Sequence, residues 1–164
     1  AVYGLTKGQS SPTTELGTLT PTTPYGKLEG ALNPLELYLT LGVSFIANAY
    51  SSRVKDLASL ITQGMDHPGF SIVHIQSPCT TYNDTHEILK GNPKNGIKPL
   101  IWDIPDDHDV TDRHAAYGLA RADGEPLGII YQDPNSISLD QRLQESNAKA
   151  KPRSIQELMQ SYQI

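Results

Sequence analysis

The segment from residue 33 to residue 76, NPLELYLTLGVSFIANAYSSRVKDLASLITQGMDHPGFSIVHIQ, decides the fold, because helix and strand patterns alternate along it. Its first four residues combine a capping Asn33 with Pro34 at the first helical position and a glutamate two positions later. Gly42 can end that helix. The apolar residues of the next stretch predict a strand over 43–50.

The second half of the segment repeats the order. Apolar residues at helical spacing predict a helix from about Arg53 to Met65, and Gly69 then leads into a strand over 70–76. That strand is a nearly continuous apolar run, which is typical of a strand covered on both faces. Alternating helices and strands predict an α/β fold with a largely parallel sheet flanked by helices.

The regions flanking this segment are less regular. Residues 15–33 are crowded with Thr, Pro and Gly and predict a long ordered loop or a lid. Downstream, Asp109 is expected to cap a helix that runs through Ala122, and Pro126 to lead into a strand over 127–131. We expect one domain over residues 1–131, followed by a helical tail over 132–164.

The tail offers two polar helices. In the last one, Ser154 and Glu157 have capping-box spacing. We expect such a helix to pack on the parent domain or on a partner subunit, and we assign it no chemical role.

Composition excludes several classes of function. The net charge of −5 and a pI near 5.4 disfavour binding to nucleic acid or to an anionic membrane surface. There is no run of 18 apolar residues and no secretory signal at the start, so we expect a cytoplasmic location. The only cysteine, Cys79, cannot form an internal disulfide, and a metal or cluster site there needs ligands from elsewhere.

The first residues form a candidate anion-binding loop. Residues 3–14 contain two glycines, five Ser or Thr hydroxyls and one lysine, Lys7. Glycines let backbone N–H groups approach a phosphate, hydroxyls add donors, and lysine adds a compact positive charge. A solvated terminal loop explains the same composition, so both interpretations stay open. Because the chain opens at Ala1 inside this motif, we expect a fragment or a cleaved product.

The string VYGLTKGQ at 2–9, followed by SPTT at 11–14, closely resembles a segment of the thiamine-diphosphate-binding beta subunits of 2-oxoacid:ferredoxin oxidoreductases. Later landmarks occur in the same order as in that family, namely Asn33-Pro34, Ser77-Pro78-Cys79, Thr81-Tyr82-Asn83-Asp84, the His108-Asp109 helix start and the strand Pro126–Tyr131. The resemblance covers Ala1 to about Tyr131. It implies the carboxy-terminal portion of such a subunit, with a thiamin-diphosphate-binding fold that is incomplete at its N-terminus.

The resemblance also implies roles for residues of the first loop. The backbone carbonyl of Val2 would be a ligand of the Mg²⁺ ion that bridges the diphosphate, and the other protein ligands would come from the upstream part of the same subunit. Gly4, Leu5 and Thr6 would lie beside the diphosphate. Lys7 would meet the carboxylate of the 2-oxoacid as a mobile point charge.

Two neighbours of Lys7 are further pocket candidates by the same resemblance. Gln9 and Ser10 would supply polar groups to the substrate pocket. For Gln9 the alternative is a side chain that only ties the loop to itself.

Cys79 has two interpretations. From the residues alone, a cysteine after a strand is usually a small buried hydrophobic side chain. The resemblance implies instead that Cys79 is the fourth thiolate of a [4Fe-4S] cluster, with three thiolates from the upstream part of the subunit.

The activity implied by the resemblance is oxidative decarboxylation of a 2-oxoacid, 2-oxoglutarate or pyruvate, to an acyl-CoA and CO₂. Electrons would pass through the cluster to ferredoxin, coenzyme A would take the acyl group, and an alpha subunit would complete a hetero-oligomer. A non-oxidative thiamine-dependent 2-oxoacid decarboxylase is the alternative enzyme, and absence of iron would favour it. A non-enzymatic partner-binding module is the other alternative, and it would not bind thiamine diphosphate.

The histidines do not form a site by their spacing. His67 beside Pro68 is typical of a turn, and His74 is expected inside a strand as a core histidine with a local hydrogen bond. The acidic run over 103–109 resembles a cation site but is expected to be a solvated turn.

Overall fold

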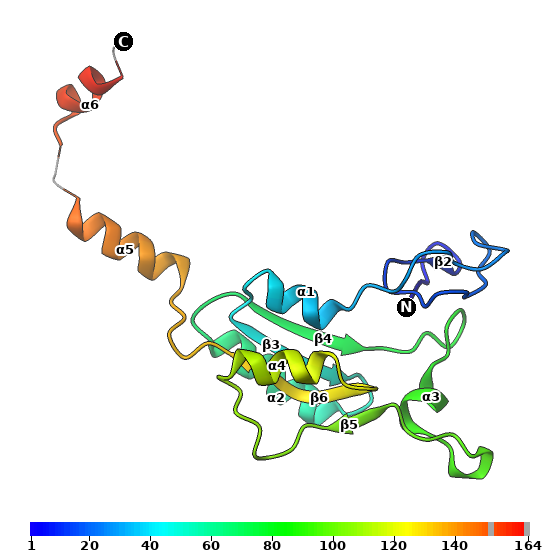
Figure 1. Ribbon diagram of the computed structural model, residues 1–164. Helices are drawn as coiled ribbons and strands as arrows, with labels where there is room; N and C mark the ends of the chain where they lie inside the picture. The colour runs from blue at the N-terminus through cyan, green and yellow to red at the C-terminus, as the bar shows by residue number, and fades with distance from the viewer. Residues whose placement is uncertain (151–152, 163–164) are drawn as a thin grey trace.

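Helices and strands alternate from Pro34 to Gln132 in the computed structural model, which describes residues 1–150 and 153–162 (Figure 1). The order of elements in this part is α1 Pro34–Thr40, β3 Phe45–Tyr50, α2 Val54–Asp66, β4 Ser71–Gln76, α3 His86–Lys90, the 3₁₀ turn η1 Pro93–Asn95, β5 Ile101–Asp103, α4 Arg113–Ala120 and β6 Glu125–Gln132. The helix and strand pattern predicted over 33–76 is confirmed, with ends that differ by one or two residues.

The start of α1 follows the predicted capping pattern. Asn33 Oδ1 accepts hydrogen bonds from the backbone N–H groups of Leu35 at 3.0 Å and Glu36 at 3.2 Å. The Asn33 amide also donates to the carbonyl of Ala120 at 2.6 Å, so the cap ties the start of α1 to the end of α4. The cap therefore fixes both helices over one face of the sheet.

The four-stranded sheet has the order β4-β3-β6-β5. The β3–β4 and β5–β6 pairs are parallel, while the central β3–β6 pair is antiparallel and carries a register shift at Ile46 and Ala47. The sheet is thus largely parallel, as predicted, with an antiparallel pair at its centre. Because β6 runs antiparallel to β3 and β4, its first residue, Glu125, lies at the end of the sheet where β4 ends.

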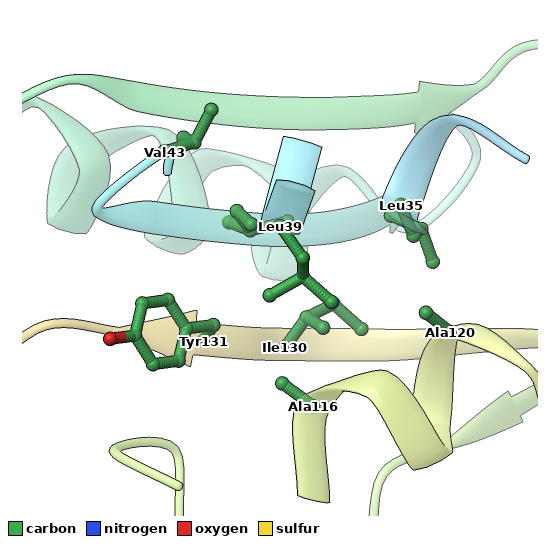
Figure 2. Close-up of a cluster of buried hydrophobic side chains, with 8 residues drawn as sticks. Leu35, Leu39, Val43, Ala116, Ala120, Ile130 and Tyr131 are labelled. Carbon is green, nitrogen blue, oxygen red and sulfur yellow. The ribbon is translucent and has the colours of Figure 1, made fainter. Parts of the chain in front are cut away.

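Helices cover both faces of this sheet. Phe45, Ala47 and Ala49 pack with Leu60 of α2 on one face. The alternate residues of β3 point to the other face, where Ile46 and Ile130 form a core with α1 and α4. Figure 2 shows Leu39 of α1 beside Ile130, with Ala116 of α4 below them and Ala120 of α4 to their right. Leu39, Ile46, Ala116 and Ile130 are fully buried.

Several details correct the sequence predictions. The helix expected to be capped by Asp109 begins three residues later than predicted, with Asp112 as its N-cap. Asp109 instead accepts hydrogen bonds from the N–H and the hydroxyl of Thr111, because a short acidic side chain can satisfy a local turn as well as a helix end.

The strand expected to be covered on both faces is also corrected. β4 lies at an edge of the sheet and is only half-buried, with Ile75 40% exposed. A continuous apolar run does not distinguish an edge strand from a central one. The short elements α3 and β5 were not predicted, since neither is long enough to show a periodic pattern.

The last two described helices are α5 Leu139–Lys149 and α6 Ile155–Ser161. The predicted capping box of Ser154 and Glu157 is confirmed, and Ser138 forms a second one with Gln141. Neither helix has a buried residue, and Figure 1 shows α5 leading away from the sheet. The division of the chain at residue 131 stays a prediction. In the described residues no helix has the length and apolar character that crossing a membrane requires.

Candidate functional site

The loop predicted to bind an anion is closed by a two-stranded ladder. β1 Val2–Tyr3 pairs antiparallel with β2 Gln9–Ser10. Between them, the N–H of Lys7 donates to the Gly4 carbonyl at 3.0 Å, and the N–H of Gly8 donates to the Tyr3 carbonyl at 2.9 Å. Lys7 has a φ of 66°, the only positive φ of a non-glycine residue in the described part of the chain. Strain of this kind is typical of loops whose shape matters for binding.

The turn presents unused backbone donors to solvent. Among residues 1–150 and 153–162, no hydrogen bond engages the N–H groups of Leu5 and Thr6. The side chains of both residues are exposed, and the Thr6 hydroxyl donates to the Tyr3 carbonyl at 3.2 Å. The backbone N–H groups of this turn are therefore better suited than its hydroxyls to donate hydrogen bonds to a diphosphate.

A second loop, residues 79–83, closes around the sulfur of Cys79. The N–H of Cys79 donates to the Asn83 carbonyl at 3.1 Å, and the N–H of Asn83 donates back at 2.9 Å. Backbone N–H groups of Tyr82, then Thr81 and Asn83, hydrogen bond to the thiol and lower the pKa of Cys79 below its ordinary value. Donors of this kind favour the thiolate, the form that binds metals.

The fold brings these two loops into contact. A Cβ atom placed on Gly4 would lie 3.5 Å from the sulfur of Cys79, and one on Gly8 would lie 3.6 Å from the ring of Tyr82. The glycines of the first loop therefore pass directly over the second. Two sites that the sequence places more than 70 positions apart form one surface.

A cleft of about 720 Å³ opens beside this surface. Its wall on one side is the N-terminal loop, including Val2 and Thr14, and its other walls are the start of α1, the end of β4 and the segment before β6. His74, Gln76 and Glu125 supply polar groups to it. The cleft therefore lies at the end of the sheet where the predicted binding loops gather.

Glu125 is a half-buried acid in the wall of the cleft. Its Oε2 accepts hydrogen bonds from the amides of Gln76 at 2.8 Å and Asn48 at 3.2 Å. Desolvation by burial raises the pKa of Glu125, and these two hydrogen bonds only partly oppose it. In the described residues Oε1 has no hydrogen-bond partner, so it is available to a donor in the cleft.

Two tyrosine–histidine pairs support the walls. The hydroxyl of Tyr38 lies 3.3 Å from Nδ1 of His74, and burial lowers the pKa of that histidine. The expected strand position and hydrogen bond of His74 are confirmed, but His74 is half-buried on the edge strand β4 and lines the cleft, so it is not a core residue. The hydroxyl of buried Tyr50 lies 2.7 Å from Nδ1 of His86, which fixes α3 and with it the end of the Cys79 loop.

The predicted site residues thus divide into two groups. Val2 lines the cleft, and Gly4 lies against Cys79. The side chains of Leu5, Thr6, Lys7 and Gln9 are exposed and lie outside the cleft lining. Ser10 is half-buried, and its N–H lies 3.5 Å from the hydroxyl of Thr22.

Sequence reasoning missed three polar residues. Glu125 and Gln76 were assigned no role, because nothing in their local pattern shows that antiparallel pairing of β6 brings them together. Lys27 was placed in a Thr/Pro-rich loop without a role, yet it is 7% exposed. A lysine flanked by turn residues carries no sequence signal of burial.

The donor set of the described residues partly fits the cofactors that the sequence implies. A main-chain carbonyl such as that of Val2 is the kind of oxygen donor that Mg²⁺ takes. Residues 1–150 and 153–162 hold no group of three or more His, Cys, Asp or Glu side chains that could bind a metal ion, so they supply only part of a metal or cluster site. Cys79 with its cradle of N–H groups fits one thiolate ligand of an iron–sulfur cluster.

Known proteins with similar sequences identify a family. Residues 79–148 match a family model that describes the C-terminal part of the pyruvate ferredoxin oxidoreductase beta subunit. The chain is 31% identical over 151 residues to a 2-oxoacid:ferredoxin oxidoreductase subunit beta of Saccharolobus solfataricus, an alignment that covers 88% of this chain and 50% of the relative. A subunit beta of 2-oxoacid:ferredoxin oxidoreductase 1 from Aeropyrum pernix is 32% identical, with 89% and 48% covered.

A solved structure has the same fold. It is a 2-oxoglutarate:ferredoxin oxidoreductase from Magnetococcus marinus with 2-oxoglutarate, coenzyme A and succinyl-CoA bound, and it superposes with a TM-score of 0.84 at 36% identity. The superposition covers 99% of this chain and 55% of that one, so the similarity continues beyond Tyr131 into the tail. This chain spans about half the length of the relatives that it matches. The chain belongs to the family of 2-oxoacid:ferredoxin oxidoreductase beta subunits.

Proposed function

We propose that this chain is the portion of a beta subunit that holds the diphosphate of thiamine diphosphate and one corner of a [4Fe-4S] cluster. The enzyme would decarboxylate a 2-oxoacid oxidatively to an acyl-CoA and CO₂ and pass the electrons to ferredoxin. The close approach of Gly4 to the sulfur of Cys79 carries the proposal, because it brings a phosphate-type loop next to a thiol whose pKa is lowered.

The residues of the first loop have distinct tasks in this proposal. The N–H groups of Leu5 and Thr6 bind diphosphate oxygens, and the Val2 carbonyl binds Mg²⁺. Lys7 stands at an exposed position in a strained turn and meets the carboxylate of the 2-oxoacid. When bound, thiamine diphosphate supplies the carbon nucleophile and electron sink that decarboxylation needs.

Cys79 has the task of holding iron as a thiolate. Backbone hydrogen bonds from Tyr82, Thr81 and Asn83 lower the pKa of the thiol and so favour the thiolate, and hydrogen bonds to cluster sulfurs are a means of tuning reduction potential. Tyr50 and His86 hold the far end of the loop. The loop therefore orients a ligand whose three companions come from the upstream part of the same subunit.

Partners follow from the same proposal. The hetero-oligomer also contains an alpha subunit, and ferredoxin, coenzyme A and the 2-oxoacid are its reaction partners. The Magnetococcus marinus structure has 2-oxoglutarate and coenzyme A bound, which favours 2-oxoglutarate as the first substrate to test, with pyruvate second. A cytoplasmic location is part of the proposal, since free thiols persist in a reducing compartment.

The test is Cys79→Ser in the full beta subunit assembled with its partner. We expect loss of iron and sulfide, or a labile cluster with a shifted potential, because serine is a poorer ligand for this iron than a thiolate. Thr80→Ala, at the exposed neighbouring position, controls for disturbance of the loop. Iron analysis with low-temperature paramagnetic resonance measures both variants.

Three outcomes separate the alternatives. A full, unaltered cluster signal in Cys79→Ser removes Cys79 from the cluster. Thiamine diphosphate without iron in the wild-type complex indicates a non-oxidative decarboxylase. A wild-type complex that takes up neither cofactor indicates a partner-binding module.

A further inference from the structure

Lys27 places a buried ammonium group among three backbone carbonyls. Its Nζ donates to the carbonyl oxygens of Thr14 at 2.8 Å, Pro12 at 3.0 Å and Gly30 at 3.5 Å. The three N–H bonds of the ammonium therefore have three oxygen partners. No carboxylate pairs with Lys27 anywhere in the described part of the chain. A buried charge without an anion persists only where the surrounding oxygens are arranged to bind it.

The carbonyls around Lys27 belong to the segment that holds residue 1. The side chain of Thr14 is 2% exposed, and its hydroxyl hydrogen bonds to the Ala1 carbonyl. The hydroxyl of Ser11 donates to the same carbonyl at 2.8 Å, and the N–H of Ser11 donates to the Thr14 hydroxyl at 2.8 Å. The Lys27 ammonium is thus two hydrogen-bonded steps from the peptide group that joins Ala1 to Val2.

We infer that Lys27 is a positioning residue for the metal-binding backbone at Val2. Its ammonium acts as a tethered cation that holds the turn over residues 11–14, and the hydroxyls of that turn hold the Ala1–Val2 peptide where the Val2 carbonyl meets Mg²⁺. This inference rests on the proposed function, because it assumes that Val2 binds the metal of thiamine diphosphate.

The physical reason lies in the carbonyl dipoles. The oxygens of Pro12, Thr14 and Gly30 all point at one space, and without a cation their like charges repel one another. The turn over residues 11–14 then opens, and the hydroxyls of Ser11 and Thr14 no longer hold the Ala1 carbonyl in place. Shortening the side chain leaves an oxygen-lined space of ammonium size, which free NH₄⁺ can refill.

The first experiment measures metal and cofactor binding without turnover. In the assembled complex of full-length subunits, Lys27→Met keeps much of the side-chain volume and removes the charge. We expect its apparent Kd for Mn²⁺ in the presence of thiamine diphosphate, followed by Mn²⁺ paramagnetic resonance, to rise by roughly tenfold or more. Lys55→Met, at an exposed position on α2, is the matched control for charge removal and should bind as the wild type does.

The second experiment distinguishes positioning from general stability. In Lys27→Ala, ammonium chloride should restore Mn²⁺-dependent binding, whereas tetramethylammonium chloride at the same ionic strength should not, because it has no N–H donors. Hydrogen exchange gives a readout free of cofactor. The N–H of Leu32, which donates to the Pro12 carbonyl at 3.0 Å, should exchange faster in both Lys27 variants and slow again with ammonium.

The outcomes are distinguishable. Lys27→Met that binds Mn²⁺ and thiamine diphosphate as tightly as wild type overturns the inference alone. Loss of binding in Lys27→Ala that ammonium does not reverse also overturns it. A wild-type complex that never retains thiamine diphosphate overturns the proposed function, and the inference falls with it.

Discussion

Gly124 sits where β5 and β6 come together at the wall of the cleft, and replacing it with alanine should be strongly destabilising. Its φ is +89°, a region that costs a residue with a Cβ about 1 to 2 kcal/mol. The new Cβ would lie 2.4 Å from the carbonyl oxygen of Leu100, which accepts the N–H of Glu125 at 2.8 Å.

The magnitude follows from adding these two effects. Real Cβ contacts essentially never fall below 3.0 Å, so strand β5 and the turn before β6 must separate by at least 0.6 Å (3.0 − 2.4). Overpacking of this kind costs about 1 to 3 kcal/mol. We therefore expect Gly124→Ala to lower the free energy of unfolding by about 2 to 5 kcal/mol.

Two other glycines separate the contributions. Gly96 has a φ of +70° with nothing within 4 Å of its Cβ position, so Gly96→Ala should cost only the backbone term of about 1 to 2 kcal/mol. Gly118 lies in α4 with open space around it and no positive φ, so Gly118→Ala should stabilise by about 0.5 to 1 kcal/mol.

Urea unfolding followed by circular dichroism measures all three variants, and an unchanged m value would show that the unfolded states are comparable. We expect the free energy of unfolding to be highest for Gly118→Ala, followed by wild type, then Gly96→Ala, and lowest for Gly124→Ala. Equal losses in Gly124→Ala and Gly96→Ala would refute the close approach of Leu100. A destabilised Gly118→Ala would refute the open space around α4.

Three further predictions concern the cleft, the loop and the core. Burial raises the pKa of Glu125, so the ionised Glu125 side chain destabilises the folded protein. This destabilisation is absent below the unfolded-state pKa of about 4.3 and complete above the raised folded-state pKa. Glu125→Gln should therefore raise stability at neutral pH and flatten the loss of stability as pH rises, and identical pH profiles by thermal unfolding would contradict this. Lys7→Met should lower kcat/KM of the assembled enzyme for the 2-oxoacid. The loss should correspond to about 1.5 to 3 kcal/mol of transition-state stabilisation, the value of one hydrogen bond to a charged group, and unchanged kinetics would remove Lys7 from the substrate site. Leu39→Ala should destabilise by about 2 to 5 kcal/mol, whereas Leu37→Ala on the exposed side of α1 should cost much less, and similar urea midpoints would argue against the core in Figure 2.

Local sequence signals were sufficient for the main helices and strands. Asn33 with Pro34 fixed the start of α1, because a side-chain oxygen two residues from unpaired N–H groups caps them regardless of what packs nearby. The capping box of Ser154 and Glu157 worked for the same reason. Asp109 failed as a cap because two acidic residues competed for the role, and it is Asp112 whose oxygen accepts from the first N–H groups of α4.

Resemblance of short motifs predicted the family and the candidate residues Val2, Gly4 and Cys79. Their expected chemistry depends on groups that can be read from the sequence. Cys79 supplies a thiol, Val2 a backbone carbonyl, and Gly4 has no side chain to block a close approach. The sequence thus determined which groups are available and the alternating α/β pattern that carries them.

Only the tertiary structure decided which of these groups meet. The antiparallel pairing of β6 with β3 places Glu125 against Gln76 and Asn48, and strand direction is set by packing over the whole sheet rather than by local pattern. The contact of Gly4 with Cys79 and the burial of Lys27 among carbonyls arise because segments far apart in sequence close over the same end of the sheet. Such long-range contacts depend on the net packing of many side chains, and no short stretch of sequence contains that information.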